Sequence, residues 1–133
     1  MNDPALDGAS RLRVLVVDAD ERIRESLAGL LSIGERTVVV GAAGDPRAAL
    51  ELVATTQPDV VVVDIRLPGL DRGRAFVGRV RRAAPGVCVV VLSPSDMLDD
   101  GYEDCAADGF VRKTFRPTEL VEAIVSARAQ TAH

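Results

Sequence analysis

The chain has 133 residues and a formal net charge of −4, and 47% of its residues are hydrophobic although only 3% are aromatic. This length suits one domain with a single sizeable core, built here from aliphatic side chains. The acidic balance excludes the usual nucleic-acid surface, which needs clustered lysine and arginine, and Lys113 is the only lysine. No apolar run approaches the roughly 20 residues of a membrane span, so we expect no membrane contact.

The start of the chain and the cysteines indicate where the protein works. The sequence MNDPALDGASR is polar and lacks the apolar segment of a signal peptide. Cys88 lies in an apolar run and Cys105 in an acidic segment, and the two have no metal-ligand spacing. Because reduced thiols are typical of the cytosol, we expect a cytoplasmic protein.

The first half of the chain alternates valine-rich runs with helical patterns. The run at 12–17 is followed by an amphipathic pattern over 21–32. The run at 37–42 is followed by Asp45-Pro46, which predicts a helix with an aspartate N-cap and a proline at its first position. Neither run alternates between polar and apolar residues, which is typical of parallel strands covered on both faces.

The second half repeats this order. A run at 59–64 precedes a helical stripe over 76–80, which ends before Pro85-Gly86. A run at 87–92 precedes the acidic segment 95–108, for which we predict a weak helix because it holds six acids, no base and a glycine.

A weaker fifth strand at 109–113 and a helix that Pro117 opens complete the pattern. Strands that alternate with helices predict an α/β fold, a doubly wound five-stranded parallel sheet with helices on both faces. In such sheets ligands bind beyond the carboxyl ends of the strands. The residues that end the strands are therefore the candidate site.

Two acids, a hydroxyl and a lysine lie at the ends of predicted strands: Asp18, Asp64, Ser93 and Lys113. Each also has a simpler interpretation, as a helix N-cap, a turn residue or a solvated lysine. Together they are better explained by one site, because clustered carboxylates require a hard divalent cation such as Mg²⁺. A carboxylate nucleophile beside Mg²⁺, a hydroxyl and an ammonium group is the equipment for phosphoryl transfer.

Four motifs occur in the order VLVVDADERIR, DVVVVDIRLPG, VVVLSPS and AADGFVRK. With these motifs the chain resembles the receiver domain of two-component response regulators. The resemblance covers residues 12–128, leaving tails at 1–11 and 129–133, and it implies the flavodoxin-like (βα)5 fold of CheY-like proteins. The form DGFVRKTFRPTELVEAI is most similar to the branch that usually carries a helix-turn-helix output domain.

The resemblance implies a phosphorylation site centred on Asp64, the expected phospho-acceptor. Asp18 would hold Mg²⁺, often through water, together with Asp64 and the backbone carbonyl of Arg66. Ser93 would be the switch hydroxyl that hydrogen-bonds the phosphoryl group, and Lys113 would pair with a phosphoryl oxygen. For the aromatic residue that rotates with the switch hydroxyl, the resemblance implies Phe110.

One residue departs from the family pattern at the metal site. Ala19 stands where receivers usually have a second acid, commonly a direct Mg²⁺ ligand. Asp20, one position further on, could substitute, although that position normally begins the helix. Because ligand charge sets the affinity of such sites, we expect weak Mg²⁺ binding.

The resemblance also implies the partners. A histidine kinase or a phosphotransfer protein would supply the phosphoryl group, and the receiver would be a signalling domain with only self-catalysed phosphotransfer and dephosphorylation. The chain stops at ARAQTAH, and no output domain follows its last predicted helix. We therefore expect a stand-alone receiver that acts on a downstream protein and not on nucleic acid. A homodimer could form through the face made of the weak helix at 95–108, the strand at 109–113 and the last helix, which is the helix 4–strand 5–helix 5 face of receivers.

Two other interpretations stay open at this point. The chain could be a pseudo-receiver, an interaction module whose Mg²⁺ binding and phosphorylation are impaired by Ala19. It could also be a haloacid dehalogenase-type phosphatase, with Asp18 as nucleophile and Asp20 as general acid. The short chain, Arg22 and the unexplained DIRLPG motif count against the phosphatase.

Overall fold

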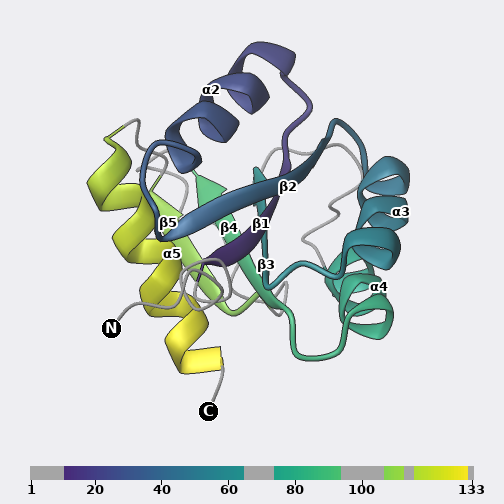
Figure 1. Ribbon diagram of the computed structural model, residues 1–133. Helices are drawn as coiled ribbons and strands as arrows, with labels where there is room; N and C mark the ends of the chain where they lie inside the picture. Colours follow the sequence, from purple (N-terminus) through teal and green to yellow (C-terminus); the bar gives the residue numbers. More distant parts are fainter. Residues whose placement is uncertain (1–10, 65–73, 94–106, 113–115, 132–133) are drawn as a thin grey trace.

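The computed structural model describes residues 11–64, 74–93, 107–112 and 116–131. Its strands form one parallel sheet in the order β2-β1-β3-β4-β5 (Figure 1). The strands are β1 (Leu12–Val17), β2 (Thr37–Ala43), β3 (Val60–Asp64), β4 (Cys88–Ser93) and β5 (Gly109–Arg112). The helices are α2 (Glu21–Leu31), α3 (Pro46–Thr56), α4 (Arg74–Ala83) and α5 (Pro117–Thr131).

This architecture confirms the predicted fold class, a doubly wound parallel sheet with helices on both faces. Figure 1 shows α2 and α5 on one side of the sheet and α3 and α4 on the other. The observed strands agree with the predicted runs to within one residue at each end. The predicted weak helix at 95–108 falls almost entirely on residues 94–106, outside the described part of the chain.

Two hydrophobic cores lie on the two faces of the sheet, since successive strand residues point to opposite faces. On one face, Leu15, Val61 and Val89 pack with side chains of α3 and α4. On the other face, Val14 and Val62 pack with side chains of α2 and α5. The continuous apolar runs of β1, β3 and β4 therefore supply both cores at once.

β2 contacts α2 on one face of the sheet and α3 on the other, as predicted, but it is less deeply buried than the central strands. Val38, Val39 and Val40 are only partly buried, whereas every residue of β3 and β4 is buried. The reason is the strand order, which places β2 at one edge of the sheet with β1 as its only neighbour.

Two helices begin as the sequence predicts. Asp45 accepts a hydrogen bond from the Ala48 backbone N–H at 2.8 Å, and Pro46 occupies the first turn of α3. Asp20 caps α2 in the same manner. These caps fix where each helix leaves the carboxyl edge of the sheet.

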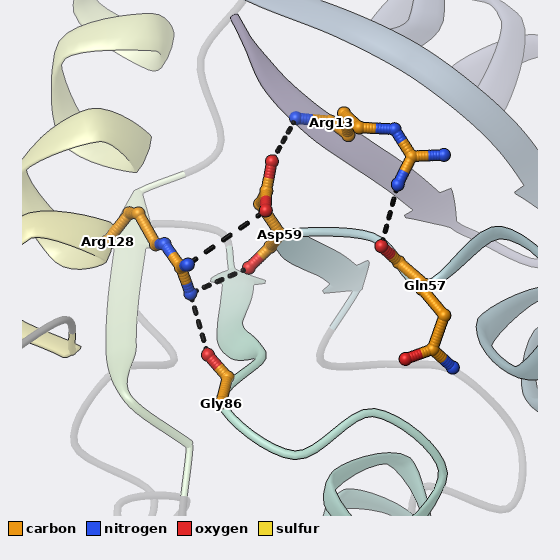
Figure 2. A network of polar contacts seen from close by, with 5 residues as sticks. All are labelled: Arg13, Gln57, Asp59, Gly86 and Arg128. Atoms are coloured by element: carbon orange, nitrogen blue, oxygen red, sulfur yellow. Dashed lines mark hydrogen bonds and ion pairs between the residues drawn. The ribbon is translucent and has the colours of Figure 1, made fainter. Parts of the chain in front are cut away.

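The opposite, amino-terminal edge of the sheet is fastened by a polar network around Asp59 (Figure 2). The Asp59 carboxylate accepts a hydrogen bond from the Arg13 backbone N–H at 2.9 Å. Arg128 of α5 lies 3.9 Å from the same carboxylate and donates to the Gly86 carbonyl at 2.6 Å. The Arg13 guanidinium donates to the Gln57 carbonyl at 2.7 Å. The network thus joins β1, β3, α5 and the loop before β4.

Asp108 repeats the same arrangement at the start of β5. Its carboxylate accepts a hydrogen bond from the Val89 backbone N–H at 2.7 Å and lies 3.2 Å from the Arg81 guanidinium. In both cases an aspartate just before a strand binds a backbone N–H of the neighbouring strand and faces an arginine from a helix. Such a contact fixes the register of the strands, so these two acids are structural.

We expect Asp59→Ala to lower the free energy of unfolding by about 1–3 kcal/mol, because it removes the acceptor of the Arg13 N–H and the partner of Arg128. Urea unfolding would measure the change. Glu122→Ala is the matched control, since it removes an exposed ion pair with Arg36 and should change stability by less than about 1 kcal/mol. Equal effects of the two substitutions would contradict the assignment.

Candidate functional site

The carboxyl edge of the sheet brings together three of the four predicted strand-end residues. Asp18 directly follows β1, Asp64 ends β3 and Ser93 ends β4. The register pairs Val17 with Val63 and Asp64 with Leu92, so these ends are level on three neighbouring strands. Adjacent strands lie about 4.8 Å apart, which places the three residues within reach of one small ligand.

All three residues are buried at this edge. The exposed fractions are 2% for Asp18, 3% for Asp64 and 0% for Ser93. Side chains of these types are rarely buried unless they are partnered, because removing a polar or charged group from water costs free energy. Two buried carboxylates and a buried hydroxyl at neighbouring strand ends are therefore a candidate polar site.

The backbone around Asp18 is held from several directions. Its N–H donates to the Ala43 carbonyl at 3.0 Å, which continues the β1–β2 ladder beyond the strand. Its carboxylate Oδ1 accepts a hydrogen bond from the Asp20 N–H at 2.9 Å. Its own carbonyl accepts a hydrogen bond from Nη1 of Arg24 at 2.7 Å. No pattern in the sequence predicted this arginine contact.

The next two residues take different positions. Ala19 is exposed and offers no ligand atom in its side chain. Asp20 is also exposed, and its Oδ1 accepts hydrogen bonds from the N–H groups of Arg22 and Ile23 at 2.9 and 3.2 Å. Asp20 is therefore the N-cap of α2, in agreement with the expectation that this position begins the helix. Its role as a substitute metal ligand stays a prediction.

The remaining predicted residues lie on or near β5 and after β3. Phe110 is paired with Val91, is partly buried and packs against the core on the α3–α4 face. Lys113 follows Arg112, which is paired with Ser93. Lys113 itself and Arg66 lie outside the described residues.

The donor set fits a hard divalent cation. Asp18 and Asp64 supply carboxylate oxygens, the ligands that Mg²⁺ prefers, and water commonly completes its coordination. Within the described ranges no group of three or more histidine, cysteine, aspartate or glutamate side chains could hold a metal. At the described strand ends, the carboxylates that a metal would meet are those of Asp18 and Asp64.

The parallel doubly wound sheet, with two acids and a hydroxyl at its carboxyl edge, agrees with the receiver fold that the sequence motifs predicted. The family model described as "response regulator receiver domain" matches residues 14–125. The chain belongs to this family, as the resemblance in the sequence predicted. The phosphatase interpretation is therefore not retained.

Curated relatives agree with this assignment. The response regulator MprA of Mycolicibacterium vanbaalenii is 36% identical over 112 residues, which are 83% of this chain and 47% of MprA. The transcriptional regulatory protein NarL of Mycobacterium tuberculosis is 35% identical over 117 residues, 86% of this chain and 54% of NarL. This similarity supports the predicted branch with helix-turn-helix output, and the chain spans about half the length of the curated relatives it matches.

Solved structures give the same fold. The signal receiver domain of NarL from Mycobacterium tuberculosis has a TM-score of 0.76 and 32% identity, covering 90% of this chain and 98% of that domain. The response regulator domain of CheB from Thermotoga maritima has a TM-score of 0.74 and 29% identity, covering 90% of this chain and 97% of that domain. Among the described residues no helix is long and apolar enough to cross a membrane.

Proposed function

We propose that this receiver accepts a phosphoryl group on Asp64 from a histidine kinase or a phosphotransfer protein and signals by contact with a downstream protein. The observation that carries the proposal is the juxtaposition of Asp64 with Asp18 and Ser93, all buried at neighbouring strand ends. A buried carboxylate at the ligand-binding edge of a doubly wound sheet is well placed to act as a nucleophile.

In the proposed reaction a carboxylate oxygen of Asp64 attacks phosphorus in line. The new P–O bond forms as the P–N bond to the donor histidine breaks, and the imidazole leaves. Bound Mg²⁺ would supply neutralisation of the phosphoryl oxygens, with Asp18, Asp64 and the carbonyl of Arg66 as its protein ligands. Lys113 would pair with a phosphoryl oxygen.

Output is proposed to begin at Ser93, whose hydroxyl would hydrogen-bond the phosphoryl group. Phe110 lies on β5, which pairs with β4, and its partly buried side chain packs against the core. A conformational change at Ser93 could therefore alter the position of the Phe110 side chain. The surface that carries the signal would be the helix predicted at 95–108, together with β5 and α5. The same surface is the proposed site of homodimer formation.

A second candidate function is favoured by Ala19. Its exposed methyl group supplies no carboxylate where receivers usually have one, so Mg²⁺ binding is expected to be weak. A receiver that cannot be phosphorylated would act as an interaction module with the same fold. The two functions differ in whether Asp64 accepts a phosphoryl group.

Beryllofluoride, a phosphoryl mimic, distinguishes the two functions. In the presence of Mg²⁺ we expect it to shift the NMR amide signals of Asp64, Ser93 and Phe110, since these residues would contact the mimic or respond to it. The amide of Asp59, at the opposite edge of the sheet, serves as the internal control. No shift at millimolar Mg²⁺ would favour the interaction module.

A further inference from the structure

The Arg24 guanidinium is fixed at the edge of the candidate site. Arg24 lies at the end of the first turn of α2, and its side chain reaches back to the carboxyl end of β1. There Nη1 donates a hydrogen bond of 2.7 Å to the backbone carbonyl of Asp18, in a partly buried setting. A charged donor on a carbonyl makes one of the stronger hydrogen bonds available to a protein.

The space for this guanidinium is provided by Gly44, which follows β2. A Cβ atom at position 44 would lie 2.6 Å from Nη1 of Arg24 and 3.5 Å from its Cζ. Gly44 has a φ outside the left-handed range, so the backbone itself does not require glycine there. The contact with Arg24 is thus the feature that a larger side chain would disturb.

The hydrogen bond from Arg24 continues to the acid itself. The carbonyl that Arg24 binds belongs to the peptide joining Asp18 to Ala19. The N–H of the following peptide, that of Asp20, donates to the Asp18 carboxylate. Two hydrogen bonds therefore fix the main chain from 18 to 20, one from Arg24 to the Asp18 carbonyl and one from the Asp20 N–H to the Asp18 carboxylate. Turning the first peptide would move the second N–H away from the carboxylate.

We propose that Arg24 is a positioning residue for the Asp18 carboxylate, acting through the Asp18–Ala19 peptide and requiring Gly44 to do so. This inference deepens and rests on the proposed function, in which the carboxylates of Asp18 and Asp64 hold Mg²⁺. Because Ala19 supplies no side-chain ligand, the Mg²⁺ affinity would depend more strongly on the orientation of the Asp18 carboxylate.

The test uses two variants that break one contact in different ways. Arg24→Gln removes the guanidinium. Gly44→Ala keeps it but fills its place, and the flexible end of Arg24 can move aside at low cost. Arg22→Gln is the matched control, since Arg22 is an exposed arginine on the same helix. Thermal unfolding of every variant checks that the fold is retained.

The first readout needs no metal. Amide hydrogen exchange at Asp20 should become about threefold to tenfold faster in Arg24→Gln and in Gly44→Ala, and stay unchanged in Arg22→Gln, because the N–H loses its fixed acceptor. The double variant should match Arg24→Gln alone, since both changes act through one contact. Unchanged exchange in the two single variants would overturn the proposal.

The second readout is Mg²⁺ affinity by titration. We expect both variants to bind Mg²⁺ about threefold or more weakly, with partial recovery in Arg24→Lys. Tighter binding by Arg24→Gln would overturn the proposal, because it would mean that the guanidinium acts only as a repelling charge. If the unaltered chain binds no Mg²⁺, the metal site of the proposed function fails, while the exchange data still decide the role of Arg24.

Discussion

Asp64→Asn is expected to abolish phosphoryl incorporation completely. Asparagine has nearly the same shape as aspartate but lacks the anionic oxygen that would attack phosphorus, so no acyl phosphate can form. Because Asp64 ends β3 and is 3% exposed, the substitution also removes one of two neighbouring buried charges and should not unfold the domain. Incorporation of labelled phosphate from a phosphorylated histidine donor measures the effect.

Asp45→Asn is the matched control for this loss. Asp45 is an exposed helix cap on the same edge of the sheet, and asparagine caps a helix about as well as aspartate. It should therefore retain full incorporation. Residual labelling of Asp64→Asn at the level of the control would assign the phosphoryl group to another residue.

Ala19→Asp is expected to tighten Mg²⁺ binding about tenfold or more, which corresponds to about 1.4 kcal/mol. The substitution adds a third carboxylate beside the buried pair, and ligand charge is the main determinant of affinity at oxygen sites. Ala19 is exposed, so the larger side chain meets no close packing. Titration followed by calorimetry or NMR would give the two dissociation constants.

Ala54→Asp provides the same added charge at a distant place. Ala54 is exposed near the far end of α3, away from the carboxyl edge of the sheet. We expect this variant to bind Mg²⁺ as the unaltered chain does. Similar gains in both variants would attribute the effect to net charge, and no gain in Ala19→Asp would mean that position 19 does not face the metal.

The central strands and the caps could be predicted because their signals are local. A continuous apolar run such as DVVVVD indicates a strand that is buried on both faces. The dipeptide Asp45-Pro46 by itself indicates the start of a helix. The shallower burial of β2 could not be predicted from its equally apolar run. Its place at the edge depends on how all five strands are ordered, which no single segment encodes.

The candidate site was predictable for a related reason, since the topology gathers whatever residues end the strands. Asp18, Asp64 and Ser93 were found in this way. The contact between Arg24 and the Asp18 carbonyl was not, because it joins a long side chain to a backbone atom across a turn. Gly44, placed between a strand and a helix cap, is the sequence signal that could have indicated the close approach of Arg24.

The structural acids at the other edge were also beyond local patterns. Asp59 reads as the polar start of a strand, and nothing near it indicates that its carboxylate will bind β1 and face Arg128. That role follows from strand pairing and from the docking of α5, which bring together residues 46 and 69 positions apart.

Phosphorylation of Asp64 can be tested by the intact mass of the unaltered chain after incubation with Mg²⁺ and a small acyl phosphate. We expect the gain of one phosphoryl group, which is lost again on treatment with hydroxylamine because hydroxylamine cleaves acyl phosphates. Thermal unfolding would first show that the protein is folded. If its mass then gains no phosphoryl group at saturating Mg²⁺, the result contradicts phosphorylation of Asp64 and leaves the interaction module as the function of this receiver.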